Sequence, residues 1–372
     1  MKLYFQNVCV EAFGYALPEE VVTSAEIESR LSPLYARLGL PEGRLELMTG
    51  IRERRFWPRG MLPSVQSAIS GERAIQQSGI DRSEIGALLH CSVCRDYLEP
   101  ATASGVHRRL GLSSDCVVYD VSNACLGLLN GMLQVANMIE LGQIRAGLVV
   151  GTESGRDLVE NTIEHLNRDT TLSRNDIKLA VASLTIGSGS AAVLLVDRDL
   201  TRTGNRLQGG LVANDTAHSH LCQSGSDEAA AGGMKPLMRT DSEALLHAGV
   251  ALARRAFPDF AAAVEWPLGA IEKTFCHQVG QAHRKLMFQA LDIDPRCDFS
   301  TVEFLGNTGA VAVPLTAALG IERGHLQPGD RVALLGIGSG INVVMLGMEW
   351  QRSLISTVPI ANSPQAAVVE AH

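Results

Sequence analysis

Cys125 is the residue in this chain whose type and setting point most directly to chemistry. It ends the segment Asp120-Val-Ser-Asn-Ala-Cys125, after an apolar run typical of a strand (116–121) and before apolar residues at helical spacing (126–141). This pattern predicts a turn at the N-terminal end of a helix, where unpaired amides and the helix dipole favour an anion. We therefore expect a lowered thiol pKa and an activated nucleophile. Cysteine is also a small apolar residue that is often simply buried, and this turn alone does not decide between the two roles.

Two further residues lie in settings that match Cys125. His277 ends an apolar run typical of a strand (271–277), and Asn307 lies in the turn Gly306-Asn-Thr-Gly309. Functional residues are expected at the carboxyl ends of such strands. A lone histidine is more often a satisfied core residue, but three such residues at matched turns predict one site.

The chemistry of such a set is thioester condensation. A thiolate at Cys125 attacks a thioester carbonyl and forms an acyl-enzyme. His277 and Asn307 then donate hydrogen bonds to the oxygen of a second thioester and stabilise its enolate, which attacks the acyl group in a Claisen condensation. The glycine-rich segment Gly336-Ile-Gly-Ser339-Gly offers amides that can join that of Cys125 around the oxyanion, although it is also an ordinary turn sequence.

The elements that must position these residues occur twice along the chain. Each copy reads helix, strand, turn, helix, strand. The first copy has its helices at 67–79 and 126–141 and its strands at 85–92 and 146–154, and the second has a helix at 242–257 and strands at 271–277 and 331–339. Two such copies predict an α/β fold of two similar halves, with apolar strands covered on both faces.

The expected organisation follows from this repeat. Residues 1–200 form the N-terminal half with the nucleophile, residues 201–352 form the C-terminal half with His277 and Asn307, and residues 353–372 form a flexible tail. The polar, helix-type region 156–179 interrupts the first half and is placed to cover an active site. The stretch 201–239, rich in Gly, Ser, Asn and Asp, predicts a short strand near 209–212 and then a loop.

Composition narrows the class of protein. The 372 residues are 46% hydrophobic and 19% charged, which allows a large core, and the net charge of −8 argues against nucleic acid as a partner. The first residues lack a signal-peptide core, and no apolar run reaches membrane-spanning length. The eight cysteines are scattered, and the spacing Cys91-Ser-Val-Cys94 has no second pair, so we expect reduced thiols in the cytoplasm and no metal site.

With these residues in view, the chain resembles a thiolase-superfamily condensing enzyme of the ketoacyl-acyl-carrier-protein synthase III type, from about residue 5 to residue 350. The segments that carry the resemblance are Thr49-Gly-Ile-Arg-Glu-Arg-Arg55, Asp120–Cys125, His277-Gln278 and Gly306-Asn307-Thr-Gly-Ala310. It implies a thiolase-like, duplicated αβαβα sandwich of five layers and a homodimer. It also implies a nucleophilic Cys125, with His277 and Asn307 assisting the enolate or a decarboxylation.

Departures from that pattern resemble one subfamily, the OleA-type enzymes that join two fatty acyl-CoA molecules head to head in bacterial olefin biosynthesis. Gly43–Met48 replaces a stretch with Trp and Arg that helps to hold coenzyme A, His277 is followed by Gln-Val-Gly280, and a late triple glycine reads Gly338-Ser339-Gly340. The phrase Arg95-Asp-Tyr-Leu-Glu99-Pro also looks like this subfamily, in which the glutamate reaches into the partner subunit's active site.

A base at Glu99 makes chemical sense for that subfamily. A malonyl donor forms its carbanion by losing carbon dioxide, whereas a plain acyl-CoA must lose an α-proton to a base within hydrogen-bond reach. A structural or surface glutamate is the alternative for Glu99, and the resemblance favours the role as base. The cluster Arg52, Arg54 and Arg55 fits either the nucleotide phosphates of coenzyme A or a solvated basic patch.

The leading hypothesis is therefore a non-decarboxylative acyltransferase that makes a 2-alkyl-3-oxoalkanoic acid and free coenzyme A from two fatty acyl-CoA thioesters. It needs no cofactor beyond the coenzyme A of its substrates. A decarboxylative 3-oxoacyl synthase III using a malonyl thioester is the alternative, and acyl carrier protein stays open as a donor. A non-catalytic subunit is disfavoured because the chain keeps Cys125, His277 and Asn307.

Overall fold

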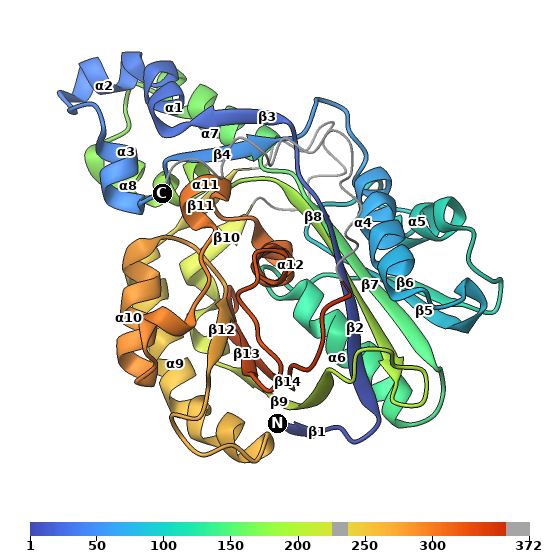
Figure 1. Ribbon diagram of the computed structural model, residues 1–372. Helices are drawn as coiled ribbons and strands as arrows, with labels where there is room; N and C mark the ends of the chain where they lie inside the picture. Colours follow the sequence, from blue (N-terminus) through green and yellow to red (C-terminus); the bar gives the residue numbers. More distant parts are fainter. Residues whose placement is uncertain (225–236, 355–372) are drawn as a thin grey trace.

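A computed structural model describes residues 1–224 and 237–354, and its centre is one mixed sheet of ten strands (Figure 1). The first half of the sheet consists of β2 (Val8–Ala16), β8 (Gly189–Asp197), β7 (Ala146–Glu153), β5 (Ile85–Cys91) and β6 (Val117–Val121), in that order. The second half consists of β9 (Arg206–Asn214), β14 (Asn342–Glu349), β13 (Arg331–Gly338) and β12 (Lys273–Cys276), with β1 (Lys2–Tyr4) beside β9. The halves meet where Cys9 of β2 pairs with Arg206 of β9.

The two halves repeat one pattern of pairing, as the sequence predicted. β7 pairs in parallel with β5 and antiparallel with β8, and β8 pairs antiparallel with β2. β13 pairs in the same way with β12 and β14, and β14 pairs antiparallel with β9. The edge strand β6 has as its counterpart an isolated parallel bridge between Thr274 and Asp298. The duplication is therefore present in the topology, not only in the order of elements.

Three helical layers enclose the two half-sheets, which gives the predicted five-layered αβαβα sandwich. The layers are α4 (Pro63–Ser78) with α5 (Thr102–Leu110), α6 (Gly127–Glu140) with α12 (Ala312–Glu322), and α9 (Ser242–Ala263) with α10 (Gln281–Leu291). Strand residues alternate between layers: Leu148 packs in the outer core, Val149 in the central one. In the other half, Leu334 joins the central core and Leu335 the opposite outer core. Strands buried on both faces explain the continuous apolar runs in the sequence.

A separate small core caps one end of the sandwich. It consists of β3 (Glu20–Thr23), α1 (Ser24–Arg30), α2 (Ser32–Leu38), α3 (Arg44–Thr49), β4 (Glu53–Phe56), α7 (Arg156–Arg168) and α8 (Arg174–Leu184). The shorter segments are η1 (Arg82–Glu84), η2 (Thr216–Leu221), β10 (Cys222–Ser224), β11 (Met238–Thr240), η3 (Pro295–Cys297), α11 (Val302–Leu305) and η4 (Gly309–Val311). The helix-type region expected at 156–179 is thus α7 and the first part of α8.

The inter-half segment is more structured than the sequence suggested. The short strand expected near 209–212 is part of the nine-residue β9, and η2 and the β10–β11 hairpin replace part of the expected loop. Residues 225–236 of that loop and residues 355–372 of the expected tail lie outside the described residues. The domain boundary at residue 200 stays a prediction. Within the described ranges, no helix has the length and apolarity needed to cross a membrane.

Candidate active site

Cys125 occupies a sharp turn between β6 and α6. Ala124, the residue before it, has a φ of 45°, a left-handed conformation that residues with a Cβ rarely adopt. The turn closes with a hydrogen bond from the amide of Leu126 to the carbonyl of Asn123, 3.0 Å long. The side chain of Asn123 also donates to Oδ1 of Asn130 on α6, at 2.8 Å. The turn is therefore fixed to the first helical turn that follows it, as expected for a presented nucleophile.

The expectation of a lowered pKa at Cys125 is wrong for the protein without substrate. Burial raises the pKa of the Cys125 thiol to about 12, and the carboxylate of Glu153 and the sulfur of Cys222 add to the rise. The helix terminus can be recognised in the sequence, whereas these two neighbours come from distant segments of the chain. At neutral pH the sulfur is therefore a thiol, and a base must accept its proton during acyl transfer.

The turn after β13 packs directly on the Cys125 turn. A Cβ at Gly338 would lie 2.9 Å from Cγ of Leu126 and 3.6 Å from Cβ of Cys125, so only glycine permits this approach. Asn342 donates through Nδ2 to the carbonyl of Ser339 at 2.9 Å and to Oδ1 of Asn123 at 3.3 Å. These contacts hold Ser339 beside the nucleophile's turn. An oxyanion role for this segment stays a prediction.

His277 follows β12 and is anchored to the neighbouring strand. Its amide donates to the carbonyl of Leu335 on β13 at 2.8 Å, three residues before Gly338. The side chain is buried, and Nδ1 has no hydrogen-bond partner among the residues that the structure describes. Burial lowers the pKa of His277 to about 3, and His283 lowers it further. The imidazole is thus neutral at physiological pH, with a ring nitrogen left for a ligand or a proton.

Asn307 lies between α11 and η4 and is held from both sides of its backbone. Its amide donates to the carbonyl of Thr185, and its carbonyl accepts from Gly187, both at 2.9 Å. Oδ1 accepts from the amide of Gly309 at 3.0 Å, which leaves the Nδ2 donor without an acceptor in the described part of the chain. Gln278, next to His277, accepts through Oε1 from the amide of Val302 at 2.8 Å. This bond links the histidine turn to the helix that leads to Asn307.

Glu153 is a site residue that our sequence reasoning missed. It ends β7, is 5% exposed, and accepts through Oε1 from the amides of Val93 at 3.0 Å and Ala310 at 3.4 Å. A Cβ at Gly309 would lie 3.2 Å from its Cγ. Burial raises its pKa, and the donor at Val93 opposes that rise. The available signal was a charged residue at the end of an otherwise apolar strand, in the half of the repeat that carries Cys125.

Glu99 lies on the loop that joins β5 to α5. It is exposed and makes no hydrogen bond or ion pair with any residue that the structure describes. Its neighbours Tyr97 and Leu98 are 57% and 53% exposed, and Val93 and Val117 are exposed as well. Within the described chain, Glu99 therefore has no hydrogen bond or ion pair with Cys125. Tyr97 and Leu98 thus present exposed apolar side chains on the same loop as Glu99.

The three arginines of the predicted cluster have different surroundings. Arg52 is 61% exposed at its side chain and pairs with Glu303 at 3.4 Å, and Arg55 donates to the carbonyl of Pro18 at 2.9 Å. Arg54 is fully buried and donates to Ser24 Oγ and to the carbonyl of Leu184, at 3.1 and 3.2 Å. The prediction that Arg54 binds phosphate is therefore wrong, because strand alternation in β4 turns its side chain into the core.

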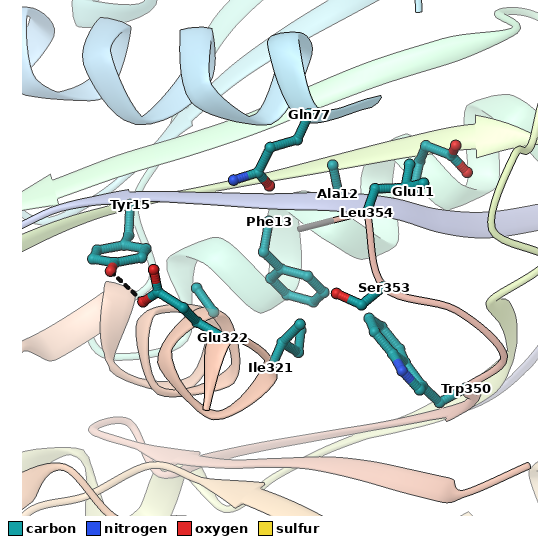
Figure 2. Close-up of a pocket in the computed structure, with 11 residues that line it drawn as sticks. Glu11, Ala12, Phe13, Tyr15, Gln77, Ile321, Glu322, Trp350, Ser353 and Leu354 are labelled. Carbon is teal, nitrogen blue, oxygen red and sulfur yellow. Dashed lines mark hydrogen bonds between the residues drawn. The ribbon is translucent and has the colours of Figure 1, made fainter. Parts of the chain in front are cut away.

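One small cavity in the structure has no functional assignment. A cavity of about 50 Å³ lies between β2, the end of α12 and the residues after β14, where Tyr15 donates to Glu322 at 2.6 Å (Figure 2). It is too small for a fatty acyl chain and includes none of the predicted site residues. Within residues 1–224 and 237–354, no three His, Cys, Asp or Glu side chains are grouped to hold a metal ion.

Comparison with known proteins matches this geometry to one class of enzyme. The family described as 3-oxoacyl-[acyl-carrier-protein] synthase III, C terminal, matches residues 261–350. A beta-ketoacyl-[acyl-carrier-protein] synthase III of Bordetella petrii is 25% identical over 88% of this chain and 93% of its own length. The duplicated αβαβα sandwich, with Cys125 and His277 after strands and Asn307 in the turn after α11, defines a thiolase-fold acyltransferase of the synthase III type.

Two more similar relatives narrow the class to a family. Proteins named acyl-CoA:acyl-CoA alkyltransferase from Shewanella oneidensis and Xanthomonas campestris are 44% and 34% identical, over 93% and 94% of this chain and 99% and 100% of their own lengths. A crystal structure of Xanthomonas campestris OleA with bound lauric acid and lauroyl-CoA has a TM-score of 0.86 at 34% identity, covering 93% of this chain and 100% of that one. The chain belongs to the acyl-CoA:acyl-CoA alkyltransferase family, which confirms the resemblance found in its sequence.

Proposed function

We propose that this enzyme joins two fatty acyl-CoA molecules in a non-decarboxylative Claisen condensation. Two acyl-CoA and one water give a 2-alkyl-3-oxoalkanoic acid and two free coenzyme A. The observation that carries the proposal is the packing of the Cys125 turn against the turn after β13, the same strand whose Leu335 carbonyl holds the amide of His277. The relatives' name, acyl-CoA:acyl-CoA alkyltransferase, supports the same reaction.

The first step is acylation of Cys125. Sγ attacks the carbonyl carbon of one acyl-CoA while neutral His277 accepts the thiol proton. Because burial holds the pKa of His277 near 3, the imidazolium passes its proton on to the departing coenzyme A thiolate. The amides of Cys125 and of the turn at Ser339 stabilise the tetrahedral oxyanion in this scheme.

The second step forms the carbon–carbon bond. The thioester oxygen of a second acyl-CoA accepts hydrogen bonds from His277 and from Nδ2 of Asn307, the donor left available by the bond of Oδ1 to Gly309. A carboxylate removes the α-proton, and the enolate carbon attacks the acyl-cysteine, which breaks the carbon–sulfur bond and releases the Cys125 thiolate. The proton held by the carboxylate then returns to the Cys125 sulfur and restores both groups. Water then cleaves the remaining thioester. All of this chemistry uses side chains and the coenzyme A of the substrates, without another cofactor.

Glu99 of a second subunit is the proposed base. Its exposure and the exposed apolar side chains of Tyr97 and Leu98 on the same loop support a homodimer in which this loop enters the partner's site. β6 is the edge strand at this end of the described sheet and can pair with a strand of a second chain. We retain Arg52 and Arg55 as proposed contacts for the coenzyme A phosphates, with acyl carrier protein as the alternative donor. The cysteines are free thiols, which supports action in the reducing cytoplasm.

The test is mass spectrometry of the protein and its products after incubation with myristoyl-CoA alone, and again with malonyl-CoA added. We expect acylated Cys125 and a 2-alkyl-3-oxo acid, or the ketone from its decarboxylation, from myristoyl-CoA alone. The Glu99→Ala variant should still acylate Cys125 but lose condensation about 100-fold or more, because no base removes the α-proton. Product only after malonyl-CoA is added, with Glu99→Ala unaffected, would instead establish a decarboxylative synthase.

A further inference from the structure

Glu153 joins segments that carry three different parts of the proposed site. Oε1 accepts from Val93, which begins the loop leading to Glu99, and from Ala310, three residues after Asn307. The carboxylate is also close enough to Cys125 to raise the pKa of its thiol. One buried oxygen therefore contacts the amides that lead to the proposed base and to the enolate-stabilising amide.

Other bonds at the end of β7 hold the same loop. Ser92 donates through Oγ to the carbonyl of Thr152 at 2.6 Å, and the amide of Ser154 donates to Sγ of Cys94 at 3.3 Å. The Glu99 loop is thus fastened to β7 on both sides of Val93. Within residues 1–224 and 237–354, the hydrogen bond between the Asn307 turn and β7 is the one from the amide of Ala310 to Glu153, so this carboxylate links the two segments.

A purely structural carboxylate is a poor explanation for this position. Burying a charged group costs free energy that an apolar side chain avoids. Its charge raises the pKa of the Cys125 thiol and so does not help to form a thiolate there. The amides that Oε1 accepts from offset part of the cost of burial, and they belong to the Glu99 loop and to the segment after Asn307. The condensation step is the one that needs Glu99 and Asn307 together.

We propose that Glu153 is a positioning residue for condensation, in which Oε1 holds the Glu99 loop and the Asn307 turn in one fixed arrangement. This inference rests on the proposed function. It assigns Glu153 no contact with either substrate. Loss of the two hydrogen bonds that Oε1 accepts should impair carbon–carbon bond formation and leave acyl transfer to Cys125 intact.

Three substitutions separate the bridge from the charge. Glu153→Gln keeps an acceptor oxygen for both amides and removes the charge, whereas Glu153→Ala removes both. Glu153→Asp keeps the charge on a shorter side chain that cannot reach both amides. We expect Glu153→Gln to condense myristoyl-CoA within about threefold of the native rate. The alanine and aspartate variants should lose about 100-fold in condensation, the size of effect that a misplacement of about 1 Å produces.

The readout is the ratio of two rates measured on each variant. Acylation is followed by the first release of coenzyme A and by the mass of acyl-Cys125, and condensation by the 2-alkyl-3-oxo product. For Glu153→Ala and Glu153→Asp we expect acylation within about threefold of native and myristate from slow hydrolysis of the acyl-enzyme. If the alanine variant does not fold, the aspartate variant carries the comparison.

Glu11 offers a matched control. It is 2% exposed and accepts through Oε1 from the amide of Arg202 at 2.9 Å, but it lies in β2, away from the site residues. Glu11→Ala should reduce thermal stability without changing the ratio of condensation to acylation. Equal loss of both steps in Glu153→Ala, or a Glu153→Gln variant as defective as Glu153→Ala, would overturn the proposal. Absence of condensation by the native enzyme would instead overturn the proposed function.

Discussion

Cys125 and His277 lie in surroundings that favour their uncharged forms. The pKa of the thiol is raised to about 12, and that of the imidazole is lowered to about 3. Both shifts have burial as their largest cause, and both act against a thiolate–imidazolium pair. The resting site therefore holds a neutral thiol and a neutral imidazole. Proton transfer must accompany attack on the thioester rather than precede it.

This pair predicts a flat pH profile for acylation. The reactive form has His277 deprotonated, which holds above about pH 3, and Cys125 protonated, which holds below about pH 12. We expect kcat/KM for acyl transfer from myristoyl-CoA to change less than about twofold between pH 6 and 9. Stopped-flow measurement of coenzyme A release gives this profile. A rate that rises about tenfold per pH unit would show that a preformed thiolate is the nucleophile.

The sequence identified some site residues and not others for a physical reason. Cys125, His277 and Asn307 follow recognisable strand or turn patterns, so local signals and the repeat point to them. The significance of Glu153 depends on bonds to Val93 and Ala310, which are 60 and 157 positions away. Glu153 also contributes to the raised pKa of Cys125, which was therefore predicted wrongly. A helix terminus can be recognised locally, but a buried carboxylate from another strand cannot.

At the scale of elements, strand alternation in β4 places neighbouring charged residues in different surroundings. Glu53 and Arg55 are partly exposed, whereas Arg54 and Phe56 are buried. Burial lowers the pKa of Arg54 to about 10, and its guanidinium binds carbonyl and hydroxyl oxygens from β3, α1 and α8. Because side chains in a strand point alternately to opposite faces, the sequence could have excluded Arg54 from a ligand-binding role.

Substituting Arg54 should therefore change stability, whereas substituting Arg52 should change substrate binding. Arg54→Ala should lower the free energy of unfolding by about 3 kcal/mol, because it leaves buried acceptors without donors. Arg52→Ala should change it by less than about 0.5 kcal/mol, as is usual for an exposed pair, and raise KM for acyl-CoA. Chemical denaturation and steady-state kinetics test the two variants side by side. A raised KM with unchanged stability in Arg54→Ala would restore its predicted role in binding.

Across the whole molecule, the proposed base Glu99 makes no hydrogen bond or ion pair with the described residues of its own chain. The duplicated halves bring Cys125 and His277 to turns after strands and Asn307 to the turn after α11, and the sequence repeat predicted that architecture. Within the described chain, Glu99 stays exposed and no further strand pairs with the outer edge of β6. The order of elements along one chain cannot reveal how two chains pair. A homodimer would cover this edge and supply Glu99 at the same time.

Mixing two inactive variants tests this arrangement directly. Cys125→Ala lacks the nucleophile and Glu99→Ala lacks the proposed base, so neither homodimer should condense myristoyl-CoA. If Glu99 acts across the interface, a mixed dimer contains one site with Cys125 from one subunit and Glu99 from the other. Random reassociation makes half of the dimers mixed, each with one working site, so activity should recover to about one quarter of native. Co-expression with two affinity tags isolates the mixed dimer, whose activity should be about half of native. No recovery in that dimer would place Glu99 and Cys125 of one catalytic site on the same chain. Condensation by the Glu99→Ala homodimer itself would instead remove Glu99 from the reaction.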